Sequence, residues 1–214
     1  ITNADTPVHL TRIFPEQGWL TVKEELGREI LDVGASRVFA VADHQVAHIY
    51  VNDPRLMQPA HDLVTGLAGV ERVDFKGSKP GRDFWHARAG QLVAVARENA
   101  WFTYYYWLDD ARAPDFARTV DIHRKPGYDP VELFLDPQLA FPKLKIAGRL
   151  LQKKLGFRML MDVIPLDATL VKGSHGRRPE DQKDWPVFIT ERPELSTAKE
   201  MESTDVYHAL LRHF

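Results

Sequence analysis

Short β-rich runs separated by turn residues constrain the fold of this chain more than any other feature. Residues 38–51 hold two apolar runs with polar residues between them, a pattern that predicts a β-hairpin. Residues 70–75 alternate between apolar and charged side chains, as a half-buried strand does. The chain must therefore build at least one sheet from neighbouring strands.

Two further runs complete this sheet-forming part of the sequence. Residues 91–96 and 101–107 predict strands on either side of a turn, and the second run is dense in aromatic side chains. A helix is expected at residues 59–67, where leucine and valine recur on one face. We therefore predict an α+β lobe over residues 38–107, inserted into a larger domain.

The larger domain is predicted to comprise residues 1–37 and 108–214. Prolines recur through residues 109–142, which predicts ordered loops and short turns rather than long elements. A helix is expected at 143–155 because leucines recur on one side and basic residues every four positions on another.

Four further elements are expected in this domain. Residues 19–23 predict a short strand followed by a loop, and residues 167–171 and 186–190 predict buried strands. An amphipathic helix is expected within residues 203–214, after capping residues. The fold class is thus α/β, with helices against a mainly parallel sheet.

Charge and composition limit the classes of function. The chain has 214 residues, with 28 basic and 30 acidic side chains and a formal net charge of −2, too balanced to attract nucleic acid as a whole. It has no cysteine and nine histidines, so a bound metal would need His, Asp or Glu ligands. No apolar run is long enough to cross a bilayer, and we expect a soluble chain of the cytoplasm or the periplasm.

The sharpest local motif is Lys172-Gly-Ser-His-Gly176, which follows an apolar run. Glycines around His175 permit a tight turn that exposes the imidazole at the end of a strand. An exposed imidazole can bind Zn²⁺ or transfer protons near neutral pH. A turn that merely reverses the chain is the simpler interpretation.

Residues 167–214 resemble the last part of the type I phosphodiesterase/nucleotide pyrophosphatase family of the alkaline phosphatase superfamily. That family has a strand, a Gly-x-His-Gly turn, a second strand and a helix that opens on Asp-Val-Tyr, here represented by Gly173-Ser-His-Gly176 and Asp205-Val-Tyr207. The resemblance implies a partial alkaline-phosphatase-like sandwich. It also implies hydrolysis of a small phosphoester at two divalent metal ions, expected to be Zn²⁺, with His175 as a ligand of one.

The same resemblance implies that part of the active site is missing. The family's Thr or Ser nucleophile and its metal-binding Asp-His pair would fall upstream of Ile1, and residues 6–10 already look like the interior of a domain. One histidine cannot replace a two-metal site. We therefore expect the chain alone to be inactive, with an N-terminal part of the same protein completing the site.

Asp43-His44 is a second candidate, because adjacent carboxylate and imidazole groups can form one edge of a metal site. The two residues also fall where the predicted hairpin turns, and a turn-forming Asp is the simpler interpretation. Contact with substrate at the rim of a cleft is the functional alternative.

The loop at residues 120–129 gathers His123, Lys125 and Tyr128 around a Pro-Gly turn. Cation, imidazole and phenol groups together suit a phosphate and its attached group, so we predict that this loop borders the cleft. Pairing of its cations with nearby aspartates is an equally good interpretation.

Two function classes besides the hydrolase stay open. A non-catalytic module could bind a ligand or partner through the aromatic lobe and the 120–129 loop. An enzyme with a different cleft could use Asp43, His44 and His123. The basic stretch 143–158 could meet nucleic acid or an anionic membrane, although such helices more often have a solvated face.

Overall fold

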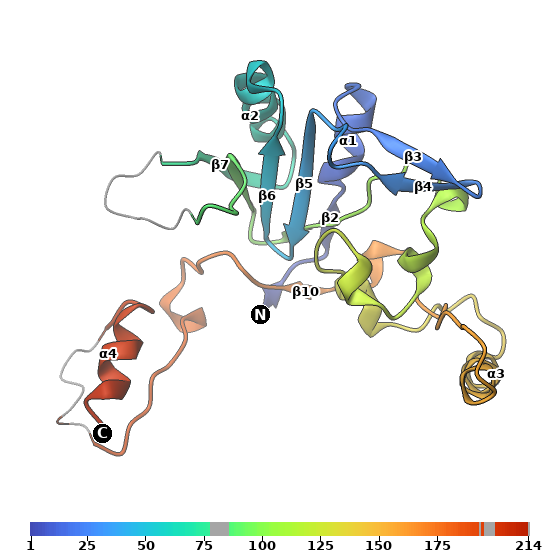
Figure 1. The fold of residues 1–214 in the computed structure, drawn as a ribbon. Coiled ribbons are helices and arrows are strands. Elements are labelled where there is room, and N and C mark those ends of the chain that lie inside the picture. Colours follow the sequence, from blue (N-terminus) through green and yellow to red (C-terminus); the bar gives the residue numbers. More distant parts are fainter. Residues whose placement is uncertain (78–85, 193, 195–199, 214) are drawn as a thin grey trace. The chain divides into compact units, whose positions relative to one another are not determined.

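A computed structural model describes residues 1–77, 86–192, 194 and 200–213 of the chain, as a mixed α/β fold with four α-helices and several small sheets (Figure 1). The chain forms two compact units, residues 1–178 and residues 179–214. The predicted core at 1–37 and 108–214 with an inserted lobe at 38–107 stays a prediction. Within the described residues, no helix is long and apolar enough to cross a membrane.

The main sheet of the first unit has four antiparallel strands in the order β5-β6-β8-β7. The predicted hairpin is confirmed as β5 (Val38–Asp43) and β6 (Val46–Val51), and the other two strands are β7 (Val70–Phe75) and β8 (Leu92–Ala96). Side chains alternate between buried and partly exposed along β5 and β6, as the period of two requires. One face of the hairpin is therefore core.

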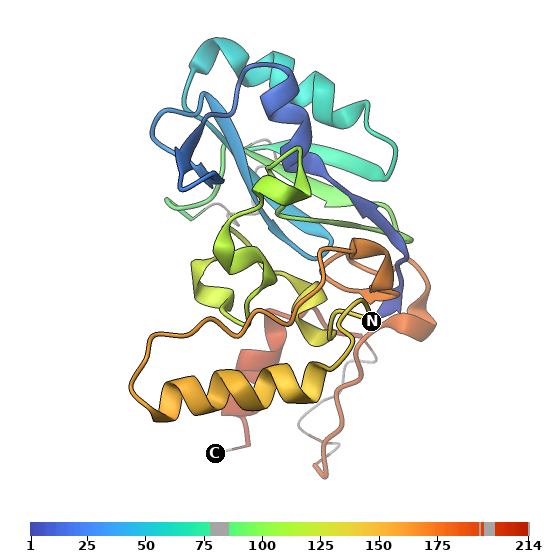
Figure 2. The same cartoon turned by 90° about the vertical axis from the view of Figure 1, so that its right-hand side faces the viewer.

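Two helices pack against this sheet, as Figure 2 shows for the upper part of the unit. α1 (Leu10–Glu16) packs on β5 and buries Leu10 and Phe14. α2 (Met57–Thr65) lies on β7 and β8, close to the helix predicted at 59–67. These contacts close the hydrophobic core.

Three two-stranded pairings complete the described sheets. β1 (Thr2–Asn3) pairs antiparallel with β10 (Gly173–Ser174), and β2 (Thr6–Val8) pairs parallel with β9 (Ala100–Phe102). β3 (Val22–Glu25) and β4 (Arg28–Leu31) form a hairpin. Only the β2–β9 pairing is parallel among the described strands, so the expected mainly parallel sheet is not found there.

Four of the predicted strands differ from the structure, three of them in the first unit. The strand expected at 19–23 is instead a hairpin over 22–31, whose turn contains Leu26 and Gly27 at positive φ. The aromatic run is a strand only at Ala100–Phe102, because β2 offers three partner residues. Residues 103–107 are nevertheless buried, so their aromatic side chains supply core volume without a strand pairing.

The strand expected at 167–171 is a short 3₁₀-helix, Ala168–Leu170. Asp167 explains the difference, because its carboxylate accepts hydrogen bonds from Thr169 N at 2.9 Å and from Thr169 Oγ1 at 2.6 Å. An Asp side chain that bonds the backbone two residues on favours a turn over a strand.

The proline-rich segment consists of ordered turns, as predicted. Four 3₁₀-helices follow one another: η2 (Asp110–Arg112), η3 (Asp115–Arg118), η4 (Ile122–Arg124) and η5 (Pro130–Leu133). α3 (Pro142–Lys154) then confirms the predicted basic helix; Pro142 opens it, and Gly156 at φ +84° follows its end.

The elements with described bounds in the second unit are the 3₁₀-helix η7 (Gln182–Asp184) and the predicted terminal helix, α4 (Asp205–Leu211). Residues 186–190 are not a strand. The hydroxyl of Thr190 lies 2.7 Å from the Nε2 atom of His213, a contact within this unit.

Candidate functional site

The turn between β5 and β6 presents Asp43 and His44 at one end of the main sheet. His44 takes a left-handed conformation with φ +54°, which a two-residue hairpin turn requires. Its carbonyl oxygen accepts a hydrogen bond from the backbone N–H of Phe102 at 2.7 Å, so the turn is tied to β9. The prediction that this pair occupies the hairpin turn is confirmed.

Gln45 is the buried anchor of this turn, and nothing in the sequence distinguished it. Its backbone N–H donates to the carbonyl of His175 at 3.0 Å, and its side-chain oxygen accepts from Arg177 N at 3.4 Å. Its amide nitrogen donates to the carbonyls of Glu98 and Ala100 at 3.0 and 3.1 Å. One buried side chain therefore joins the turn to the segment that carries His175.

His175 directly follows β10 and is exposed. Gly176 has φ +113°, a conformation that favours glycine and lets the chain turn away from the imidazole. The predicted Gly-x-His-Gly turn thus does present His175 at the end of a strand, although that strand is two residues long.

The loop at residues 120–129 reaches the same end of β5. Tyr128 N donates to the carbonyl oxygen of Ala42 at 2.8 Å. A Cβ atom on Gly127 would lie 2.4 Å from that oxygen, so only glycine permits this close approach. The loop therefore borders the hairpin turn through backbone contact with β5.

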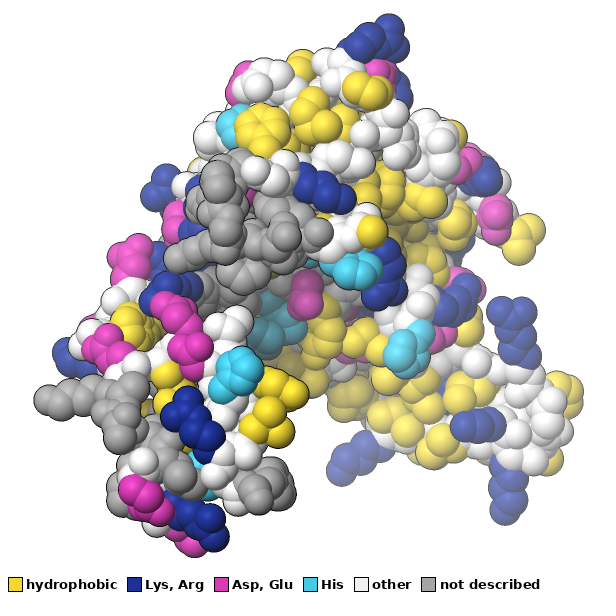
Figure 3. All heavy atoms as spheres, turned by 60° about the vertical axis from the view of Figure 1, so that its left-hand side comes forward, with side chains coloured by type: hydrophobic (Ala, Val, Ile, Leu, Met, Phe, Trp, Pro, Cys, Tyr) yellow, Lys and Arg dark blue, Asp and Glu magenta, His cyan; other side chains and the backbone are white. Residues whose placement is uncertain are grey.

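These three segments bring four side chains together in what we term the histidine stack: Asp43, His44, Tyr128 and His175. The ring of His44 is its centre, with ring centroids 3.9 Å from His175 and 4.4 Å from Tyr128, both stacked. Nδ1 of His44 lies 2.6 Å from a carboxylate oxygen of Asp43. Histidine and acidic side chains lie next to one another on the face that Figure 3 turns forward.

The surroundings of His175 favour its neutral form. Desolvation of the stacked ring face lowers the pKa of His175, the neighbouring His44 and the N-terminal amino group lower it further, and Asp43 opposes them. A neutral imidazole retains a lone pair, which metal binding or proton acceptance requires. The electrostatics therefore suit a ligand or a base.

The stack does not by itself form a metal centre. Among the described residues, no group of three or more His, Asp or Glu side chains is arranged to hold an ion. The rings of His44 and His175 lie face to face, so their nitrogens do not converge on one point as zinc ligands must. The described residues thus provide at most one ligand, His175, and not the complete two-metal site that the resemblance implied.

The other two candidates of the loop, Lys125 and His123, are not members of the stack. The Lys125 side chain is fully buried, and Nζ lies 2.8 Å from Asp129 and 2.6 Å from Glu132. This arrangement gives Lys125 a structural ion pair rather than a surface for substrate. His123 lies in η4 and is exposed.

Comparison with protein-family models matches residues 1–129 to the type I phosphodiesterase/nucleotide pyrophosphatase model. The chain belongs to this family. The matched residues make up more than half of the 214 residues, and no curated protein matches the chain.

The candidate residues differ in whether they fall within the part of the chain that matches the phosphodiesterase family. Asp43, His44, His123, Lys125 and Tyr128 all fall within the matched residues. His175 and the segment 167–214, which carries the resemblance described above, lie outside them. The family match therefore includes the β5–β6 hairpin and the 120–129 loop, and it does not include the segment that carries His175.

Proposed function

We propose that this chain contributes one side of the active site of a metal-dependent hydrolase of phosphodiester or pyrophosphate bonds. Membership of the phosphodiesterase family supports hydrolysis of phosphoesters. The observation that carries the proposal is the contact between His44 and His175, at 3.9 Å between ring centroids, because it joins the family-matched hairpin to the Gly-x-His-Gly turn.

In this proposal His175 is a ligand of one of two divalent ions, with Zn²⁺ the expected metal. Asp43 accepts a hydrogen bond from Nδ1–H of His44, which fixes the tautomer of that ring and its orientation against His175. Tyr128 covers the other face of His44 and borders the substrate pocket. When bound, metal ions would stabilise negative charge that develops on phosphoryl oxygens.

The other ligands and the Thr or Ser nucleophile are proposed to come from protein outside the described residues. Support comes from the described part of the chain, which has no cluster of three metal-ligating side chains. Two metals act together in this chemistry, so one histidine edge gives no turnover. We therefore propose that the 214-residue chain alone is inactive.

The test compares the 214-residue chain with the complete polypeptide that, in this proposal, contains it, each with Zn²⁺ and bis(4-nitrophenyl) phosphate. We expect turnover by the complete polypeptide and none by the chain. In the complete polypeptide, His175→Ala should reduce kcat by a factor of about 100 or more and weaken Zn²⁺ binding in calorimetry. His208→Ala, an exposed histidine of α4, is the matched control and should change neither.

The outcomes separate the hydrolase from a binding module. Turnover by the isolated chain would contradict the incomplete site, and full activity of His175→Ala would remove the metal-ligand role. Tight binding of a phosphoester by the complete polypeptide, with no turnover and no bound metal, would replace the hydrolase with the non-catalytic alternative. His123→Ala tests whether this exposed residue of the loop contacts substrate. If it does, loss of the contact in the variant should raise KM.

A further inference from the structure

Helix α3 is attached to the first unit by its charged side. Lys145 Nζ and Arg149 Nε lie 3.0 and 2.8 Å from the two carboxylate oxygens of Asp162. None of the residues of α3 is buried. The helix therefore has no hydrophobic face in the core, unlike α1 and α2.

The apolar stripe of α3 faces away from this attachment. Leu144, Leu151 and Leu155 follow one another at seven and four residues, which places them on one helical face, and their exposed fractions are 70, 56 and 64%. Lys145 and Arg149 belong to another face. A globular helix normally buries its leucine stripe and exposes its cations, and α3 does the reverse.

Aromatic residues extend the stripe beyond both ends of the helix. Phe141 precedes α3 and Phe157 follows it, and both are about as exposed as the leucines. Ala147 and Gly148 lie between the leucines, and a Cβ on Gly148 would meet nothing within 4 Å. In the lower right of Figure 3, yellow side chains gather over α3 with dark blue ones around them.

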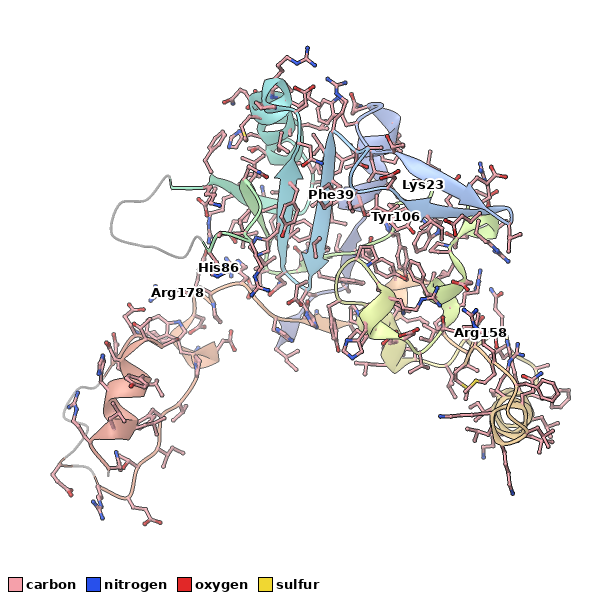
Figure 4. The ribbon with its side chains drawn as sticks, viewed as in Figure 1. Lys23, Phe39, His86, Tyr106, Arg158 and Arg178 are labelled. Carbon is pink, nitrogen blue, oxygen red and sulfur yellow. The ribbon has the colours of Figure 1, made fainter. Side chains whose placement is uncertain are left out.

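The charge of this segment selects the kind of occupant. Residues 143–158 carry six basic side chains and no acidic one. Lys143, Lys153 and Lys154 are exposed and have no acidic partner among the described residues. Arg158 lies just beyond the helix, whose side chains project outward around its axis in Figure 4. The occupant must therefore bury leucines and neutralise positive charge.

A second copy of the chain meets only the first requirement. Packing two α3 stripes against each other would bring the same lysines of both copies close together, and like charges repel. Nucleic acid meets only the second, because its phosphate backbone does not bury leucines. An anionic lipid surface meets both.

We propose that α3 lies in the plane of an anionic phospholipid surface. The five large apolar side chains Phe141, Leu144, Leu151, Leu155 and Phe157 enter the boundary between headgroups and acyl chains. The lysines contact lipid phosphates, and their methylene stems lie along the apolar surface. This binding is peripheral and does not depend on the hydrolase proposal.

Flotation of the 214-residue chain with vesicles tests the proposal without any variant. We expect binding to phosphatidylcholine vesicles that contain phosphatidylglycerol, much weaker binding to phosphatidylcholine alone, and release as salt screens the lysines. Absence of binding to the anionic vesicles would overturn the proposal. The proposal would also be overturned if the chain formed a dimer in analytical ultracentrifugation and did not bind the anionic vesicles, because a second copy would then cover α3.

Two variants separate the apolar from the charged contribution. Leu151→Gln with Leu155→Gln should reduce partitioning to anionic vesicles about tenfold or more. Lys153→Glu with Lys154→Glu should also reduce binding to anionic vesicles, but should leave the weak binding to phosphatidylcholine vesicles unchanged. Leu26→Gln is the matched control, since Leu26 is fully exposed in the β3–β4 turn, and it should bind as the unaltered chain does. Equal binding by the leucine variant, with an unchanged circular dichroism spectrum, would exclude insertion of the stripe.

Discussion

At the residue scale, a buried ion cluster holds the part of the 120–129 loop that contains Tyr128. Lys125 is enclosed by Asp129 and Glu132, and its Nζ atom also lies 5.8 Å from the centroid of the Tyr104 ring. Burial raises the pKa of Asp129, and the Lys125 cation opposes that rise. The pair closes the loop around Tyr128, which stacks on His44.

We predict that Lys125→Met lowers the free energy of unfolding by about 3–5 kcal/mol, because it leaves two carboxylates without their cation. Urea unfolding measures this loss. Lys23→Met is the control, since Lys23 is largely exposed and its pair with Asp32 should contribute no more than about 1 kcal/mol. Further replacement of the acids, as Asp129→Asn and Glu132→Gln, should recover part of the stability; a loss no larger than that of the control would show that the cluster is not needed.

The candidate site residues were easier to select from the sequence than their contacts were. His175 and Asp43-His44 could be selected from the sequence because their chemistry and the nearby turns are local features. The stacking of His44 on His175 joins positions far apart in the chain, and no local pattern encodes it. Pairing of the loop's cations with nearby aspartates was one of two interpretations of the sequence, and the structure shows this pairing for Lys125 and Asp129. The complete burial of the pair depends on the fold, and no local pattern indicates it.

At the element scale, the loop and β5 meet so closely that one glycine controls their packing. Gly127 has φ +137°, and an added Cβ would lie 2.4 Å from the carbonyl oxygen and 3.0 Å from the nitrogen of Ala42. Backbone atoms of β5, which pairs with β6 along its whole length, cannot move aside cheaply. Any side chain at position 127 must therefore push the loop, and Tyr128 with it, away from His44.

We predict that Gly127→Ala lowers the free energy of unfolding by about 2–4 kcal/mol, from backbone strain plus the clash. Gly18→Ala separates these two causes, because Gly18 has φ +67° but no atom lies within 4 Å of an added Cβ. Its cost should be about 1 kcal/mol. Chemical denaturation of both variants is the measurement, and equal losses would mean that the contact with Ala42 is not tight.

Elements were predicted well where both their pattern and their partners are local. The hairpin of β5 and β6 and helices α2, α3 and α4 follow from alternation, helical period and capping residues. The aromatic run after residue 100 has strong strand propensity, yet its pairing stops where β2 ends. The parallel pairing of β2 with β9 depends on chain segments more than ninety residues apart, which sequence periodicity does not report.

At the scale of the whole molecule, burial of a neutral histidine links stability to pH. His9 precedes α1, and its Nδ1 atom lies 3.0 Å from the hydroxyl of Thr103. Burial, followed by the nearby Arg12, lowers the pKa of His9 from 6.5 to about 4, although Asp110 opposes this. The unfolded chain therefore takes up a proton at this residue at higher pH than the folded chain does.

The sign of the pH dependence follows from that difference. Above pH 6.5 His9 is neutral in both states, and between pH 6.5 and about 4 only the unfolded state is protonated, so stability falls as the pH falls through this window. The loss should be about 2 kcal/mol after a discount for the part of the ring that water reaches. His9→Asn keeps an amide near Thr103 and removes the titration. Urea unfolding at pH 7.5 and at pH 4.5 should show a smaller loss for this variant than for the unaltered chain, and identical losses would mean that other groups cause the acid sensitivity.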